Sequence, residues 1–176
     1  PTAALPPRHV RAGAANRLRF RDFQQRARID VTAALDAPEK NRDGRLQVFW
    51  NVAPQKWHCM GVSLNAGGAM GWFRSALADF AGADALSYDD IAARAAHSPP
   101  GARGLVFLSY LNGERCPHPD PAARGAFVGL TTRHGGADLA RAVMEGVVHS
   151  LHDIYALMEP MGIGRNVIKA SGGGAR

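Results

Sequence analysis

The segment ADLARAVMEGVVHSLHDIYALM, residues 137–158, carries the strongest helical pattern in the chain. Its apolar side chains recur every three or four residues and form one helix face: Leu139, Val143, Val147, Leu151, Ile154 and Met158. Arg141 and Glu145 stand four residues apart, at the spacing of a helical ion pair. We therefore predict a long amphipathic helix over residues 137–158.

Short apolar segments on either side of this helix predict strands. Residues 46–52 and 57–64 flank a turn that contains Pro54 and indicate a hairpin. Residues 105–108 indicate a strand buried on both faces, and residues 125–130 indicate another. A last strand is predicted over residues 166–170, directly before the glycines near the end of the chain.

Two shorter helices are also predicted. One runs over residues 67–80, with Asn65 as a candidate cap and an apolar stripe at Met70, Phe73, Leu77 and Phe80. The other begins at Ser87, where Ser87 and Asp90 have the spacing of a capping box. The aromatic residues near these elements are expected in the core: Phe49, Trp50, Trp57, Trp72 and Phe73.

The composition is that of an ordinary globular domain. The chain has 176 residues, of which 46% are hydrophobic and 20% charged. It has no apolar run near the length of a membrane span, so we expect no membrane insertion. Two cysteines, Cys59 and Cys116, exclude a four-cysteine zinc site and fit a reducing compartment, so we expect the cytoplasm.

The positive charge is concentrated at the start of the chain. Residues 1–30 hold seven Arg and two Asp, which gives +5 of the net +6, and residues 31–176 carry the remaining +1. Nucleic-acid binding therefore does not follow from the charge of the whole chain. We interpret residues 1–30 as an atypical basic leader, disordered or translated out of frame. A transit peptide and an RNA-binding arm are the alternatives.

The glycines at the end of the chain carry the sharpest chemical signal. Glycine has no side chain, so the backbone N–H groups of glycines at the end of a strand can approach a phosphate or a nucleobase closely. A flexible tail would have the same composition. The small residues at 66–71 provide a second surface for close approach.

Several separate motifs resemble one family, the FGGY carbohydrate kinases, and the xylulokinases in particular. They occur in order and at consistent spacing: PQKWH at 54–58, LNAGG at 64–68, FLSYLNGERCPH at 107–118, ARGAFVGLT at 123–131, LARAVMEGV at 139–147 and ASGGGA at 170–175. The resemblance covers about residues 31–176 and concerns the C-terminal, nucleotide-binding domain of the family.

The resemblance implies an α/β fold of the actin-like ATPase type, in which two ribonuclease-H-like domains enclose a cleft. Here the fold would be incomplete, the C-terminal half of a sugar kinase. ATP, with Mg²⁺, would donate its γ-phosphoryl group to a ketopentose such as xylulose. Gly172, Gly173, Gly174 and Ala175 match the adenosine-contacting motif, and Gly67 and Gly71 match the other wall of the pocket. The loop at 113–118 matches a signature that we interpret as structural or interdomain, with Cys116 where the family usually has Thr.

The chain also departs from the family pattern. The Gly-Asp-x-Ala segment with the catalytic Asp and the phosphate-binding Gly-Thr-Ser-Gly turn are both missing near residue 30, and the sugar-binding domain is missing altogether. We therefore assign no catalytic residue and expect the isolated chain to be inactive. Sugar would bind only if the missing domain were supplied, and the surface of a lost interface favours self-association.

We interpret the other groups of reactive residues as structural or solvent-exposed, without a chemical role. His58 and Cys59 with Cys116 and His118 lack metal-site spacing, and Cys116 with His118 lacks an orienting acid for nucleophilic chemistry. Glu145, His149 and His152 share a helix face that we expect to be solvated, so no metal site is predicted. Two functional alternatives stay open: a non-catalytic remnant whose basic arm binds polyanions, and a kinase for another sugar or polyol.

Overall fold

The computed structural model describes residues 29–39, 43–81, 86–163 and 169. The expected basic leader, the strand at 166–170 and the closing glycines lie outside these residues, apart from the short overlaps at 29–30 and 169. The elements follow the order β1 (Ile29–Leu35), β2 (Gln47–Trp50), β3 (Trp57–Ser63), α2 (Ala66–Ala81), α3 (Tyr88–Ala95), β4 (Val106–Leu108), β5 (Ala126–Val128) and α4 (Gly136–Ala156). Two short 3-10 turns, Ala102–Gly104 and Glu159–Met161, complete the set.

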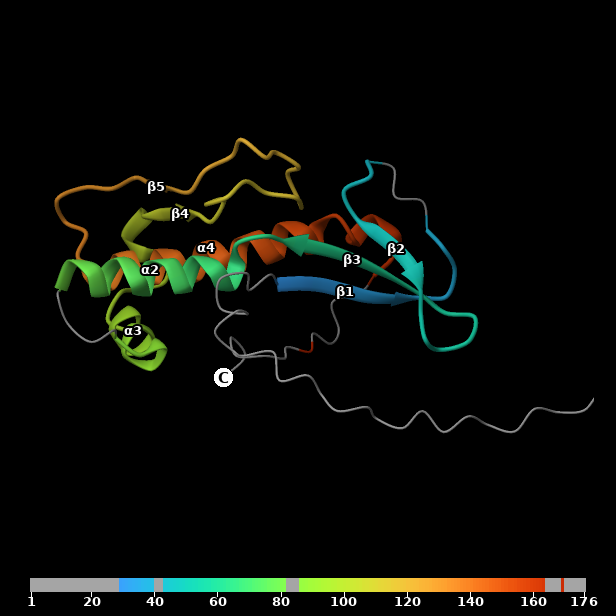
Figure 1. Ribbon diagram of the computed structural model, residues 1–176, viewed down its shortest axis with the longest axis horizontal. Coiled ribbons are helices and arrows are strands. Elements are labelled where there is room, and N and C mark those ends of the chain that lie inside the picture. The colour runs from blue at the N-terminus through green and yellow to red at the C-terminus, as the bar shows by residue number, and fades with distance from the viewer. Residues whose placement is uncertain (1–28, 40–42, 82–85, 164–168, 170–176) are drawn as a thin grey trace, which may run out of the picture.

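The strands form two antiparallel sheets on the same long helix. The first sheet has the order β1-β3-β2, and the second pairs β4 with β5. Figure 1 shows α2 and α4 side by side, with β4 and β5 on one side of them and α3 on the other. The three-stranded sheet lies along the C-terminal part of α4. The predicted hairpin, the predicted helices and the strand near 125–130 are thereby confirmed, with ends shifted by a few residues.

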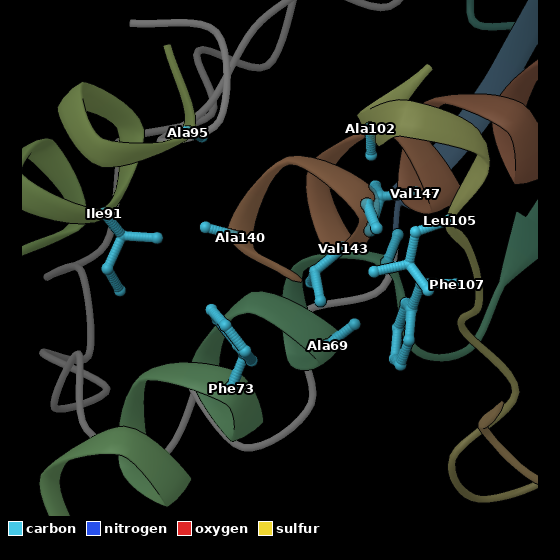
Figure 2. Close-up of a cluster of buried hydrophobic side chains, with 12 residues drawn as sticks. Ala69, Phe73, Ile91, Ala95, Ala102, Leu105, Phe107, Ala140, Val143 and Val147 are labelled. Carbon is cyan, nitrogen blue, oxygen red and sulfur yellow. The ribbon is translucent and has the colours of Figure 1, made fainter. Parts of the chain in front are cut away.

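Helix α4 contributes to two hydrophobic cores, because its apolar stripe runs the length of the helix. In the first core it packs against α2, α3 and β4, and Figure 2 shows Val143 near Ala69 and Phe73, and Val147 near Ala102 and Leu105. In the second core Ile154, and Met158 just past the helix, pack under the three-stranded sheet, with Leu35, Leu46, Cys59 and Cys116. Each predicted stripe residue is buried or half-buried.

Gly146 lets α4 approach β4 at backbone distance. A Cβ at this position would lie 2.2 Å from the carbonyl oxygen of Phe107, closer than any side chain can sit. Neighbouring side chains of β4 point to opposite faces: Phe107 is 2% exposed in the core, whereas Val106 is 47% exposed. The expectation that 105–108 is buried on both faces was therefore wrong, because the helices of the described residues cover one face of this two-stranded sheet and leave Val106 on the other.

The aromatic residues are less buried than predicted. Phe73 is 5% exposed, but Phe49, Trp50 and Trp72 are 43%, 65% and 42% exposed. Phe80 continues the predicted stripe of α2 and yet is 98% exposed, because no other described residue covers the last turn of that helix. Spacing identifies a helix face, but it does not tell how far the neighbouring elements extend along it.

Helix α3 begins as predicted. The Ser87 hydroxyl accepts from the backbone N–H of Asp90, and the Asp90 carboxylate accepts from the backbone N–H of Ser87. Arg74 of α2 lies over the ring of Tyr88, 5.1 Å from its centre, and donates to the carbonyl of Leu86. These contacts tie the start of α3 to α2.

Strand β1 was not predicted. It includes Ile29 and Asp30, which the sequence analysis assigned to the leader, and it pairs along its whole length with β3. In IDVTAAL the two alanines and the threonine weaken the alternation that marks a strand. Pairing with β3 therefore stabilises this strand, although its own sequence pattern is a weak indication of one.

The first turn of α4 is held by a buried carboxylate. Asp138, 6% exposed, accepts from the Ser98 hydroxyl at 2.6 Å, from the Gly135 amide at 3.0 Å and from Arg103 at 3.2 Å. The hydrogen bond from Ser98, with those from Gly135 and Arg103, lowers the pKa of Asp138 below its ordinary value near 3.8. The ionised form is thus favoured in the folded state.

Gly146→Ala is expected to destabilise the chain by roughly 1–3 kcal/mol, because the added methyl group overlaps a backbone oxygen and α4 must move away from β4. Gly68→Ala is the matched control, since no atom lies within 4 Å of the point where the Cβ of this helical residue would stand. The control should keep or raise stability by about 0.5–1 kcal/mol. Urea unfolding followed by circular dichroism measures both, and equal effects would contradict the close approach.

Asp138→Asn is expected to reduce the acid sensitivity of the fold. A carboxyl whose pKa is lowered on folding stabilises the protein above its unfolded pKa, near pH 4, and that contribution is lost as the pH falls through the folded pKa. Melting temperatures measured from pH 6 to about pH 2 should fall less steeply in the variant than in the wild type. Asp79→Asn, at an exposed position of α2, controls for the loss of one negative charge.

Candidate functional site

The first turns of α2 offer a helix surface almost without side chains. Ala66 and Ala69 are fully buried and face the first core, whereas Gly67 and Gly71 are half-buried and lie one turn apart. The two predicted pocket glycines therefore share one face of the helix. Gly68 between them has open space where its Cβ would be. At these three glycines the helix backbone has no side chain of its own to cover it.

The other predicted pocket residues, Gly172, Gly173, Gly174 and Ala175, lie outside the described residues. Their position relative to Gly67 and Gly71 stays a prediction.

A buried glutamate fixes the junction between β3 and α2. Glu114, 3% exposed, accepts from the Ser63 hydroxyl at 2.9 Å and from the backbone N–H of Leu64 at 2.9 Å. Its carboxylate also accepts from the backbone N–H of Arg115 at 2.8 Å. A carboxylate with three donors keeps its charge satisfied away from water. It thereby joins the loop at 109–121 to the end of β3, three residues before α2 begins.

The amide of Asn65 strengthens the same junction. Its Nδ2 donates to the carbonyl of Gly113 at 2.8 Å, and its Oδ1 accepts from the Asn112 amide at 3.3 Å. The side chain is thus engaged with the loop and not with the first turn of α2, so its predicted role as a side-chain cap was wrong. Only its backbone carbonyl takes part in the helix, accepting from Ala69.

The loop at 109–121 makes a tight turn at Gly113. This residue has φ of 83°, and a Cβ would lie 2.8 Å from the carbonyl oxygen of Pro121. Glu114 and Asp120 exchange backbone hydrogen bonds at 2.9 and 3.0 Å across the loop. Glycine is required here both by conformation and by space. A rigid loop then presents the Glu114 carboxylate to Ser63 and Leu64.

The cysteines have no catalytic environment. Cys59 and Cys116 are 0% and 1% exposed, and burial raises the pKa of both thiols. His118, two residues after Cys116, is exposed. A protonated, buried thiol is a poor nucleophile.

The acid and the histidines on α4 are likewise engaged or solvated. Glu145 accepts from Arg141 at 2.6 Å, which confirms the predicted pair, and from the Gly101 amide at 3.1 Å. Burial alone would raise the pKa of Glu145, but these hydrogen bonds lower it overall. His149 and His152 are exposed. In the described part of the chain no three His, Cys, Asp or Glu side chains are placed to hold a metal ion.

Comparison with known proteins decides the family. Residues 31–176 match the model of the C-terminal domain of the FGGY family of carbohydrate kinases. The chain belongs to this family. A xylulose kinase of Staphylococcus epidermidis is 40% identical over 134 residues, which is 76% of this chain and 26% of that protein. A xylulose kinase of Escherichia coli is 40% identical over 128 residues, 73% of this chain and 25% of that protein.

Solved structures agree with the sequence relatives. The crystal structure of a xylulose kinase from Bifidobacterium adolescentis superposes with a TM-score of 0.73 at 28% identity, over 85% of this chain and 28% of that one. The FGGY chain thus has the actin-like ATPase fold expected from the motifs, as a mixed helix and strand part of the C-terminal region. It spans about a quarter of the length of the curated relatives that it matches.

The same FGGY motifs map onto the geometry. The stretch 64–68 is the junction between β3 and α2. The stretch 107–118 contains most of β4 and the loop that is hydrogen-bonded to this junction. The sequence analysis described this loop as structural without identifying its key residue. Glu114 carried no local signal, because two of its three donors, Ser63 and Leu64, lie about 50 residues earlier in the chain. A membrane span would need a longer apolar helix than any that the described residues form.

Glu114→Ala is expected to lower the free energy of unfolding by roughly 3–5 kcal/mol, because it strips a buried, multiply bonded charge and leaves its donors unpaired. Glu114→Gln retains an acceptor and should cost less. Asp79→Ala, at an exposed position of α2, is the control and should change stability by less than about 0.5 kcal/mol. Denaturant unfolding monitored by tryptophan fluorescence gives all three values. A loss in Glu114→Ala no larger than in the control would contradict the network.

Proposed function

We propose that this chain forms one wall of the nucleotide pocket of a sugar kinase, which transfers the γ-phosphoryl group of ATP to a ketopentose such as xylulose. Membership of the FGGY family supports the kinase, and the relatives named xylulose kinase support the substrate. The observation that carries the proposal is the pair Gly67 and Gly71, one turn apart on one face of α2, next to the junction that Glu114 holds in place.

The geometry fits an adenine nucleotide. Glycine at i and i+4 leaves a shallow strip of helix backbone on which a planar base or ribose can lie. Backbone N–H groups at the start of a helix, together with those of a glycine-rich turn, favour phosphate. We propose that Gly172, Gly173, Gly174 and Ala175 close the pocket from the opposite side.

In this proposal the described residues position the nucleotide and do not transfer a proton. Phosphoryl transfer depends on alignment and on charge stabilisation more than on covalent help from the protein. Mg²⁺ keeps several waters and takes its other ligands largely from substrate phosphates, so we propose that it enters with ATP. We assign no base to this chain; its role is to hold the nucleotide so that the γ-phosphoryl group faces the sugar.

Mg·ATP and Mg·ADP at millimolar concentration are expected to raise the melting temperature. A ligand that binds only the folded chain adds about 2.7 kcal/mol of stability at a hundredfold excess over Kd. Gly71→Leu should abolish the shift by filling the wall, and so should Gly173→Val with Gly174→Val. Ala76→Leu adds bulk at an exposed position of α2 and should keep the shift.

Each shift is taken relative to the same variant without nucleotide, so that a loss of basal stability does not imitate a loss of binding. No shift in a folded wild-type chain would overturn the proposal. A shift in Gly71→Leu equal to that of the wild type would show that α2 is not a wall of the pocket.

A further inference from the structure

The loop at 109–121 has an inner part that is buried and an outer part that is exposed. Residues 118–122 are exposed, and the inner residues are buried: Gly113, Glu114, Cys116 and Pro117. Two backbone hydrogen bonds between Glu114 and Asp120, at 2.9 and 3.0 Å, connect the two parts. The loop is therefore one hydrogen-bonded unit that reaches from solvent to the interior.

The inner part of the loop binds three consecutive residues. The Ser63 hydroxyl and the Leu64 N–H donate to the Glu114 carboxylate. The Asn65 amide donates to the carbonyl of Gly113. Ser63 and Asn65 are 0% and 4% exposed, so a bond that is lost here leaves a buried polar group unpaired. The loop therefore constrains every residue of the segment 63–65.

The sheet holds the same segment less firmly than it holds the rest of β3. Among the described strands, β2 pairs with β3 only as far as Met60, whereas β1 continues to Ser63. Leu64 and Asn65 follow the end of β3. At this end of the strand the loop thus supplies hydrogen bonds that a second neighbouring strand supplies elsewhere.

The segment 63–65 leads directly into the first turn of α2. The carbonyl of Asn65 accepts from the N–H of Ala69 at 2.6 Å. Only Ala66 separates Asn65 from Gly67, and Ala66 is completely buried. Because no flexible spacer lies between them, a shift of Asn65 also shifts Gly67.

We propose that the loop at 109–121 regulates the affinity of the start of α2 for ATP, with Glu114 as a positioning residue. The inference rests on the proposed function, in which Gly67 and Gly71 belong to a wall of the nucleotide pocket. Glu114 is 3% exposed, so it acts through Leu64 and not by touching the nucleotide. By linkage, a loop held in place raises the affinity for ATP, and bound ATP in turn holds the loop in place.

The coupling needs no large conformational change. A contiguous network of buried hydrogen bonds can connect two places in a protein, because loosening one of them loosens the other. A ligand that binds to an already ordered wall loses less conformational entropy. Couplings of this kind typically change an affinity by about 5-fold to 150-fold. A contact that displaces the exposed outer part of the loop would therefore weaken ATP binding.

The first test is the Kd for Mg·ATP of the full chain, measured by isothermal titration calorimetry. Gly113→Ala distorts the loop, because Gly113 has φ of 83° and a Cβ would lie 2.8 Å from the carbonyl oxygen of Pro121. The variant adds no atom to α2. Its Kd should be about fivefold or more above that of the wild type.

Gly129→Ala is the matched control. Gly129, just past β5, has φ of 86°, and a Cβ would lie 2.8 Å from the carbonyl oxygen of Gly104. The two substitutions thus impose the same kind of backbone strain and the same overlap, but Gly129 belongs neither to the loop nor to α2. The control should keep the wild-type Kd. Circular dichroism at the temperature of the titration shows that each variant is folded.

Side-chain variants test the hydrogen bonds themselves. Asn65→Ala removes the bonds to Gly113 and Asn112 but keeps the backbone carbonyl that accepts from Ala69, and its Kd should rise. Glu114→Gln keeps an oxygen that accepts two N–H groups, and its amide can donate to the Ser63 hydroxyl. It should therefore raise the Kd less than Glu114→Ala does.

Hydrogen exchange tests the reciprocal effect of ATP on the loop. Mg·ATP should slow exchange of the Glu114 and Asp120 amides by a larger factor than exchange of the Asn51 amide. The Asn51 amide is hydrogen-bonded within the β2–β3 hairpin and reports the general stabilisation by a ligand. In Asn65→Ala the two factors should become equal.

The outcomes separate this inference from the proposed function. A folded wild-type chain that does not bind Mg·ATP would overturn both. The same Kd in the wild type, Gly113→Ala and Asn65→Ala would overturn the coupling alone and leave the proposed pocket standing. An equal rise of the Kd in Gly113→Ala and Gly129→Ala would also overturn it, because general strain would then explain the effect.

Discussion

The backbone of α4 lies directly against that of β4 at Gly146, where a single methyl group would meet the carbonyl oxygen of Phe107 at 2.2 Å. This approach sets the distance between the long helix and the second sheet, and so the space available to Phe107, Val143 and Val147 in the first core. Because interiors are packed at crystal-like density, that spacing propagates to α2 and α3, which share the same core. The arrangement of the described helices depends on it.

The same helix connects this core with the one beneath the three-stranded sheet. Ile154 and Met158 are fully buried there, beside Cys59 and Cys116. Gly61 of β3 allows this fit, because a Cβ would lie 2.3 Å from the Ile154 side chain. One helix, with a glycine at each of these contacts, therefore holds two sheets that share no strand.

Hydrogen bonds from buried polar side chains then fix the position of the loop at 109–121 against β3 and α2. The Glu114 carboxylate and the Asn65 amide fasten the loop at 109–121 to the last residues of β3 and the first of α2. This is the place where the motif at 64–68 passes from β3 into α2. The glycines at the start of α2 have no side chains that could fix the position of the helix, so the neighbouring hydrogen bonds fix it instead.

Local pattern determined the elements and the family. The 3.6-residue period at 137–158, the capping box at Ser87 and the paired segments at 46–52 and 57–64 depend on residues close in sequence, and each was predicted. The motifs from 54 to 147 likewise identified the FGGY fold and placed Gly67 and Gly71 on one helix. Tertiary structure alone decided the pairing of β1, the exposure of Phe80, Val106 and Trp50, and the role of Glu114. In each case the deciding partner lies many residues away or a covering element is lacking among the described residues, and burial is a property of that surrounding and not of the residue itself.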